Sequence, residues 1–482
     1  MHAAARELEA HSPVSAPALP QIASAEGQVA RTAWLDRGLA AVAALGTAVL
    51  ATVQSGRIHP DEVYQFLEPA NHVAFHFGVL SWEWHQGVRN WVVPAALAAG
   101  MKLFDALGGT SALGHRLGAA LVVALLGYPG FRALLGYAER RTQSALAARL
   151  GFALVLLWST SLYFLGRTLG EPMGVLCGIA AIGALDGEDR PLRRGLLAGL
   201  WLGLAVVVRY GFATLVVAVL VQTLIERRWR ALLGALASGA GVALLLGVLD
   251  WLSWGKPWKS IFEYVRFNLG GGAARMFGTK PWWFYLEVCL TWAPWPLLLA
   301  APKLRLRQDR MLLPALAYLL ALSATAYKVD RFVFPVLLLL VAALAPAAGA
   351  WLVELWSSGR ARRSAAVLAG AGCLALSAWS YSRLPDLESD LFRATMQVGR
   401  DPALRQLIVV NESIWGSGGN FYVGRDLRVY YTGPGYPGYI QVMRNPNVNR
   451  AVVFRSPKDQ RDLERFGFQQ VGAVGETTIL AR

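Results

Sequence analysis

The sequence predicts a polytopic, all-helical membrane protein that carries a small α/β domain at its C-terminal end. Hydrophobic residues make up 55% of the 482 residues and charged residues only 16%, whereas soluble domains average about 45–50% and about 25%. Windows such as 117–135, 232–252 and 332–352 are nearly free of charge, and each is close to the roughly 20 apolar residues that cross a bilayer. This composition excludes a disordered chain and argues against a soluble enzyme.

The N-terminal part predicts a tail followed by a transmembrane domain. Residues 1–33 are rich in Ala, Pro and Ser and predict a disordered cytoplasmic tail. The formal net charge of +15 would suggest nucleic acid in a soluble protein, but here the basic residues punctuate apolar segments. The transmembrane domain covers 34–383. Eleven spans are expected in it, near 39–53, 117–136, 146–165, 171–185, 195–208, 211–225, 232–252, 283–301, 311–327, 332–353 and 364–381.

The loops between these spans alternate in charge, which predicts the orientation of the protein. One set is short and basic, and the positive-inside rule places it in the cytoplasm; it comprises 139–141, 189–194, 227–230, 303–310 and 360–363. The apolar segment 91–107 would invert this alternation if it crossed the membrane. Because it is short and contains Pro94, Lys102 and Asp105, we predict a juxtamembrane or re-entrant helix there.

The composition changes after Tyr381, and residues 384–482 predict an extracytoplasmic α/β domain. Four short strands are expected at 407–411, 427–431, 450–454 and 477–480, with a helix at 459–466. The glycine-rich segment 416–419 follows the first of these strands. It matches neither the dinucleotide-binding nor the P-loop fingerprint, so we interpret it as a plain turn.

The first outer loop, which runs from His59 to Arg89, holds the residues that are most informative about chemistry. Asp61 and Glu62 stand directly after the first span, where one carboxylate can take a proton from a hydroxyl while its neighbour positions the acceptor. The competing interpretation is a capped amphipathic helix with Pro60 in its first turn and acids near its N-terminus. The residues alone leave these two alternatives balanced.

Further charged residues lie at the outer ends of later spans. Arg167 and Glu171 have the spacing of an ion pair across one helical turn, and Arg209 has the bland explanation of a snorkelling side chain. Residues 327–331 pack three charges between two spans, and ionisable residues at membrane depth are costly and often functional. The five basic residues between 256 and 280 depart from the charge rule and favour an anionic partner such as a lipid phosphate.

These motifs occur together in one known family. His59-Pro60-Asp61-Glu62 is followed by Trp82-Glu83-Trp84, and later by Asn268-Leu269-Gly270 and Arg331-Phe332. With them, the chain resembles the family 22 glycosyltransferases of the GT-C fold, the dolichyl-phosphate-mannose-dependent mannosyltransferases of N-glycan precursor and GPI-anchor synthesis, which have bacterial relatives. The sequence departs from the family pattern at Arg89-Asn90, at Arg209-Tyr210-Gly211 and within residues 327–332, where Lys328 is kept.

The resemblance implies an inverting transfer of a sugar, with mannose favoured, from a polyprenyl- or dolichyl-phosphate donor to a glycan or glycolipid acceptor on the outer face. Asp61 is then the general base, and Glu62 supports it or the acceptor. The leaving phosphate is assigned to Lys328, Arg331, Arg209 and Arg89. Substrate contacts are assigned to His59, Gln65, Glu68, Trp82, Glu83, Arg167, Glu171 and Tyr327. Membrane lipid is a further partner and nucleic acid is not; we predict no metal ligand and no certain cofactor, although a divalent cation stays open.

Two other function classes compete with an enzyme. A lipid-linked-sugar transporter or flippase needs polar residues near the midplane and broken spans, whereas the charges here gather at one face. A scaffold that displays the C-terminal domain would leave the outer carboxylates without a role. The Ala-, Leu- and Arg-rich composition favours a bacterial inner membrane with a periplasmic site; in a eukaryote the same arrangement predicts the endoplasmic reticulum membrane.

Overall fold

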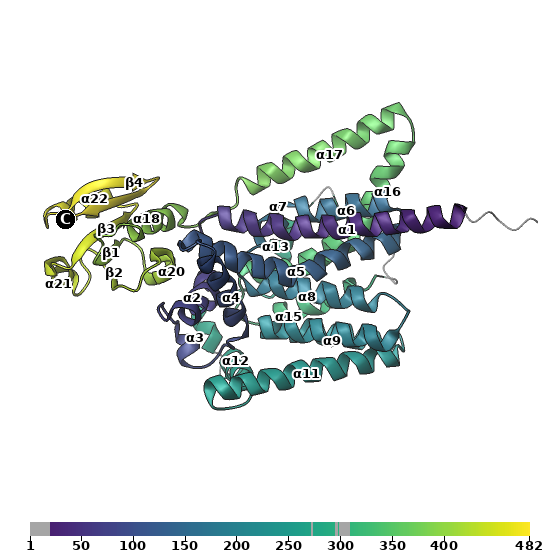
Figure 1. The fold of residues 1–482 in the computed structure, drawn as a ribbon, viewed down its shortest axis with the longest axis horizontal. Coiled ribbons are helices and arrows are strands. Elements are labelled where there is room, and N and C mark those ends of the chain that lie inside the picture. The colour runs from purple at the N-terminus through teal and green to yellow at the C-terminus, as the bar shows by residue number, and fades with distance from the viewer. Residues whose placement is uncertain (1–19, 271–272, 295–296, 298–308) are drawn as a thin grey trace, which may run out of the picture.

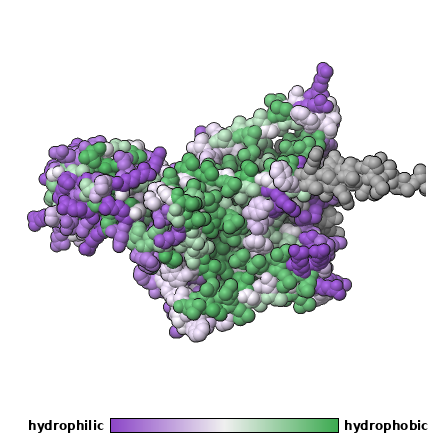
Figure 2. All heavy atoms as spheres, viewed as in Figure 1, coloured by the Kyte–Doolittle hydropathy of each residue, from purple (hydrophilic) through white to green (hydrophobic). Residues whose placement is uncertain are grey.

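The computed structural model describes residues 20–270, 273–294, 297 and 309–482. Figure 1 shows a bundle of helices with the C-terminal α/β domain beyond one of its ends. We call this end the domain end. The opposite end carries the basic loops 139–141, 189–194 and 227–230, and we call it the basic end. Figure 2 shows a hydrophobic band between hydrophilic groups at the two ends.

Six helices are long and apolar enough to cross a membrane, which confirms a multi-pass membrane protein. Residues 1–19 of the expected tail lie outside the described residues, and the first helix begins at Pro20. The six helices are α1 (Pro20–Val53), α5 (Ala112–Thr142), α9 (Pro191–Val208), α11 (Trp229–Trp254), α16 (Phe334–Ser357) and α17 (Arg360–Tyr381).

Shorter apolar helices complete the bundle. They are α6 (Ala145–Leu157), α7 (Ser159–Phe164), α8 (Gly170–Leu185), α10 (Ala213–Ile225), α13 (Phe284–Trp292) and α15 (Leu312–Ala324). The expected span 283–301 and the basic loop 303–310 fall partly outside the described residues. The prediction of eleven spans is therefore confirmed for six long helices and remains a prediction for the rest.

The segments between the apolar helices form short helices. Figure 1 places α2, α3 and α4 at the domain end. The helix α4 has 15 residues and is not among the six candidate spans; whether 91–107 crosses the membrane stays a prediction. These segments are η1 (Glu62–Leu67), α2 (Glu68–Phe75), α3 (Trp82–His85), α4 (Val92–Ala106), η2 (Tyr210–Phe212), α12 (Lys259–Leu269), η3 (Ala273–Phe277) and η6 (Asp330–Val333).

Small residues and burial set the packing of the bundle. Most residues of α8 are buried, which is typical of a helix surrounded by others. Against α9, the helix α11 packs so closely that a Cβ at Gly195 or Gly199 would collide with the carbonyl oxygens of Ala231 and Ala235. Such small-residue contacts are a common means of joining helices in a bilayer, where apolar side chains gain little by leaving lipid.

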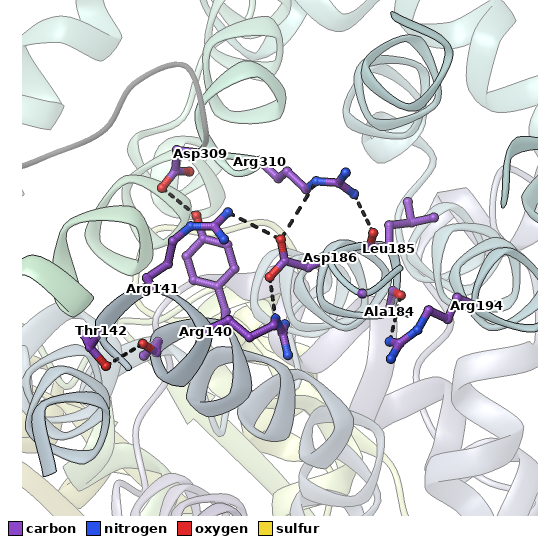
Figure 3. A network of polar contacts seen from close by, with 12 residues as sticks. Arg140, Arg141, Thr142, Ala184, Leu185, Asp186, Arg194, Asp309 and Arg310 are labelled. Carbon is purple, nitrogen blue, oxygen red and sulfur yellow. Dashed lines mark hydrogen bonds and ion pairs between the residues drawn. The ribbon is translucent and has the colours of Figure 1, made fainter. Parts of the chain in front are cut away.

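An arginine network fastens the basic end. Figure 3 shows Arg140, Arg141 and Arg310 converging on Asp186, the residue that ends α8. The Nε of Arg140 lies 2.6 Å from Asp186 Oδ2, and Arg141 lies 3.3 Å from Oδ1. Arg310 also donates to the carbonyl of Leu185 at 2.5 Å. The arginines that predict orientation therefore also satisfy the exposed carbonyls at the end of a central helix.

The C-terminal domain is a five-stranded mixed sheet with the order β2-β1-β3-β5-β4. The strand β1 pairs in parallel with β2 and β3, and β5 pairs antiparallel with β3 and β4. The elements are α18 (Ser389–Gly399), β1 (Gln406–Val410), α19 (Ile414–Ser417), α20 (Gly419–Val423), β2 (Val429–Tyr431), α21 (Tyr439–Arg444), β3 (Val448–Phe454), α22 (Pro457–Glu464), β4 (Gln469–Val474) and β5 (Thr477–Ala481).

The four predicted strands and the predicted helix of this domain are confirmed. The strand β4 was missed because it lies at the edge of the sheet, where most of its side chains face solvent and carry no buried apolar pattern. The helix α18 was also missed, although its residues Leu391, Phe392 and Ala394 are fully buried.

Candidate active site

The first outer loop turns into a π-helix at the domain end. Asp61 caps η1, all six residues of η1 are buried, and the N–H of Glu68 closes the turn on the carbonyl of Val63. The N–H of Asp61 donates to His59 Nδ1 at 3.2 Å, which holds the loop before the turn. Single π-helical turns occur frequently at functional sites. The amphipathic-helix interpretation is thus partly right about local structure, but it leaves the charges of this loop unexplained.

Arg331 joins two carboxylates from distant parts of the chain. Its guanidinium donates to Asp61 in the first outer loop and to Glu171 in the first turn of α8. Arg209 adds a second cation, 3.2 Å from Glu171, and both guanidinium groups lie over the ring of Phe332. The side chain of Glu171 is 0% exposed and that of Arg331 3%, whereas Asp61 is 22% exposed. Asp61 is therefore the carboxylate of this network that an incoming molecule can reach.

The surroundings of Asp61 keep it ionised. Burial alone would raise its pKa, but the guanidinium of Arg331, together with the contact to His59, outweighs burial and holds the pKa of this carboxyl well below its usual range. A carboxylate in this state is charged at neutral pH and a weak base for as long as Arg331 stays beside it.

Glu62 belongs to a second, more deeply buried network. Its Oε1 lies 3.3 Å from Arg167 and 3.6 Å from Arg116, and all three side chains are at most 4% exposed. Arg167 also donates to the carbonyl of Gly56 at 2.8 Å, and its other terminal nitrogen lies 3.8 Å from Asp386. The adjacent carboxylates thus have different partners. Glu62 is held by buried arginines, whereas Asp61 is partly exposed.

Further predicted residues line the same region. Glu83 accepts hydrogen bonds from Arg89 at 2.7 Å and from Gln65 at 3.3 Å, so these three predicted residues contact one another. Trp82 packs against Phe267 at a tilt, with ring centroids 4.7 Å apart. Tyr327 packs edge-on against Phe332, the ring that carries Arg209 and Arg331.

Lys328 and Glu68 are placed differently from the others. The ammonium of Lys328 donates to the carbonyl oxygens of Thr325 and of Lys280, the latter at 3.2 Å. Glu68 is 0% exposed and points to the C-terminal domain, away from the arginines. In the part of the chain that the structure describes, no group of three His, Cys, Asp or Glu side chains is arranged to hold a metal ion.

Sequence reasoning missed Arg116 and the linker to the C-terminal domain. Arg116 donates to the carbonyls of Ser55 at 2.8 Å and Gly56 at 3.1 Å, beside its contact with Glu62. An arginine in the first turns of an apolar helix was the signal that could have found it. The linker is the segment between α17 and α18. Its Glu388 forms an ion pair with Arg57, which lies 2.8 Å away.

The profile of the Alg9-like mannosyltransferase family matches residues 39–382, which is most of the chain. The chain belongs to this family. The match covers the described membrane helices from α1 to α17 and ends before the C-terminal domain. This match confirms the family resemblance that the outer-loop motifs predicted. It also confirms that the family is one of glycosyltransferases.

Curated relatives of this family member include GPI mannosyltransferase 3 of Yarrowia lipolytica. It is 28% identical over 296 residues, which are 60% of this chain and 58% of the relative. The GPI alpha-1,2-mannosyltransferase 3 of Homo sapiens is 25% identical over 285 residues, covering 58% of this chain and 51% of the relative. The chain thus spans little more than half the length of the curated relatives that it matches.

The fold also matches a solved structure. ArnT from Cupriavidus metallidurans in its apo state has a TM-score of 0.58 at 15% identity, covering 95% of this chain and 98% of ArnT. The same protein bound to undecaprenyl phosphate gives a TM-score of 0.57 at 15% identity, with 93% and 98% coverage. At this identity the likeness concerns the fold, and it extends beyond the membrane helices to most of the chain.

Proposed function

We propose that this protein transfers mannose from a polyprenyl-phosphate donor to a hydroxyl of a glycan or glycolipid on the outer face of the membrane, with inversion at the anomeric carbon. The observation that carries the proposal is the network of Asp61, Arg331, Glu171 and Arg209 at the domain end. It combines an accessible carboxylate with one buried cation, Arg331, and one partly buried cation, Arg209. Membership of a mannosyltransferase family supports the sugar, and the undecaprenyl phosphate bound to ArnT supports the donor class.

In the proposed step, Asp61 accepts the proton of the acceptor hydroxyl while that oxygen bonds to the anomeric carbon. The bond from this carbon to the donor phosphate breaks at the same time, and the phosphate leaves with the electron pair. Its growing negative charge needs preorganised cations. Arg331 and Arg209 supply them, with Arg89 and Lys328 as further cations at this end of the molecule.

The contact between Asp61 and Arg331 implies that the donor binds before Asp61 can act as a base. A donor phosphate that binds Arg331 competes with Asp61 for the guanidinium, because both are anions that accept from its paired donors. Asp61 then loses the neighbour that most lowers its pKa and becomes a stronger base. The donor therefore prepares the base for the acceptor.

The remaining predicted residues surround this centre. Glu62, held by Arg167 and Arg116, fixes the loop behind Asp61. His59, Gln65, Trp82, Glu83 and Tyr327 are proposed to contact the sugar or the acceptor, because they lie on the segments that meet around Asp61. Proton transfer needs no metal in this scheme, and a divalent cation is left open as an aid to the donor phosphate.

The test is incubation of the purified full-length protein in detergent with synthetic undecaprenyl-phosphate-mannose or dolichyl-phosphate-mannose and a panel of glycan and glycolipid acceptors. Mass spectrometry should detect acceptors heavier by one mannose together with free polyprenyl phosphate. An Asp61→Asn variant should give both products about 10²–10⁴-fold more slowly. Equal product from the variant, or nucleotide-sugar consumption by the wild type, would contradict the proposal.

A further inference from the structure

Just beyond the glycine-rich turn 416–419, a backbone N–H group binds a carboxyl group of this protein. The carboxylate of Glu68 reaches this turn from the first outer loop. Its Oε1 accepts the N–H of Phe421 at 2.8 Å, just beyond the turn, and its Oε2 accepts the N–H of Val79 at 2.7 Å. The segment follows β1, at the carboxyl ends of the parallel strands, which is the edge where α/β sheets usually place their ligands.

The carboxyl group of Glu68 fits here because Gly419 has no side chain. This residue has a φ of +64°, and a Cβ on it would collide with Glu68 Oε1. Glu68 itself is 0% exposed. Burying a carboxyl group without hydrogen bonds is costly, and the two N–H donors offset part of that cost.

Two further contacts tie the same domain to the catalytic loop. The hydroxyl of Tyr64, four residues before Glu68, donates to the carbonyl of Ile414, and its ring lies 4.9 Å from that of Trp415. On the other side, Arg116 donates to the hydroxyl of Tyr422 and lies 3.6 Å from Glu62. The C-terminal domain thus holds both ends of the π-helical turn.

We propose that Glu68 is a positioning residue: seated in the 419–421 segment, its carboxylate docks the C-terminal domain on the first outer loop and fixes the turn that carries Asp61 and Glu62. The π-helical hydrogen bond from Glu68 to Val63 makes the link direct, because the residue that closes the turn is the one that is anchored. Glu68 acts through the backbone and touches no reacting atom. The inference rests on the proposed function only for its activity readout.

The docking is tested by hydrogen exchange on the purified full-length protein, which needs no substrate. In Glu68→Ala and in Gly419→Ala, peptides covering 62–68 and 419–423 should exchange about tenfold faster than in the wild type, since local opening becomes easier. Gly424→Ala is the matched control. Its φ of +69° brings similar backbone strain, but its Cβ would meet nothing within 4 Å, so exchange should stay within about twofold of the wild type.

The double variant tests whether the steric contact is the cause. Without the carboxylate, the Cβ of Gly419→Ala no longer meets Glu68, so Gly419→Ala should add to Glu68→Ala no more than the strain that Gly424→Ala brings. Additive effects would contradict the proposal. It would also be overturned if Glu68→Ala left exchange at 62–68 unchanged, or if Gly419→Ala and Gly424→Ala behaved alike.

The activity readout separates positioning from stabilisation. With synthetic undecaprenyl-phosphate-mannose, Glu68→Ala should lower kcat per folded molecule about tenfold and change the donor KM by less than about twofold, because the turn carries the base and not the phosphate site. An unchanged kcat would reject positioning. If the wild type transfers no mannose, the proposed function fails, while the exchange experiment still decides on docking.

Discussion

Arg331 offers the sharpest test of the site, because its replacement by alanine changes both the base and the leaving-group cation. Removing one partner of a buried ion pair costs about 3–5 kcal/mol. The cost here should lie near the lower end, since Glu171 keeps Arg209 at 3.2 Å and Asp61 keeps His59 at 3.2 Å. Loss of one preorganised donor to a developing anion lowers kcat by about 10²–10³-fold, so we expect Arg331→Ala to fold and to turn over slowly.

The same substitution should change the pH dependence. In the wild type the pKa of Asp61 lies well below its usual range, so kcat/KM should not fall on the acid side between about pH 5 and 7. Without Arg331, burial is opposed only by weaker positive neighbours and the pKa rises. Because the reaction needs ionised Asp61, kcat/KM of Arg331→Ala should fall as the pH drops through this raised value.

The assay is mannose transfer from the synthetic donor, measured by mass spectrometry per folded molecule. Arg331→Lys keeps the positive charge but loses the planar pair of donors of the guanidinium, so its turnover should lie between that of the wild type and that of Arg331→Ala. Arg465→Ala is the control, since its side chain is 81% exposed and its ion pair is at the surface. Wild-type turnover in Arg331→Ala, with only the thermal stability reduced, would refute this reasoning.

Three further predictions concern other parts of the molecule. Asp61→Asn should lower turnover by about 10²–10⁴-fold and leave donor binding intact; loss of donor binding would contradict the role of a base. Burial raises the pKa of Glu68 from 4.5 to about 7, with the hydroxyls of Tyr64 and Tyr431 as its titratable neighbours. Stability should therefore fall by about 3 kcal/mol as pH rises from about 4.5 to 7, and the fall should be absent in Glu68→Gln; equal slopes would exclude this group. Cysteines placed at Gln86 and Thr110, both exposed, should react alike with an impermeant thiol reagent added outside, and protection of the second alone would show that the segment between them crosses the membrane.

The sequence was informative where a residue type is rare in its surroundings. Asp61, Arg167 and Arg331 are charges beside long apolar segments, so their placement at one end of the bundle could be predicted from hydropathy and loop charge. Their pairing could not. Asp61 and Arg331 are 270 positions apart, and no local pattern says which of several cations at the domain end lies beside which carboxylate.

Local patterns did not give the contacts of Glu68 or all of the C-terminal domain. The family resemblance assigned Glu68 to substrate, which stays a prediction, and the structure shows its contact with a residue 353 positions later. The glycine-rich turn was interpreted as a plain turn, and its sequence carried no sign that the segment beyond it contacts the distant Glu68. Strand β4 escaped because an edge strand needs no apolar alternation.

The distance along the chain between partners has a consequence for biogenesis. Residues 61 and 62 leave the ribosome early, but the guanidinium that pairs with Asp61 belongs to residue 331 and the amide that receives Glu68 belongs to residue 421. A nascent chain therefore lacks both contacts until residues 331 and 421 have been synthesised and the segments that carry them have folded. A chain truncated before residue 331 would lack both of these partners and could not assemble the network around Asp61.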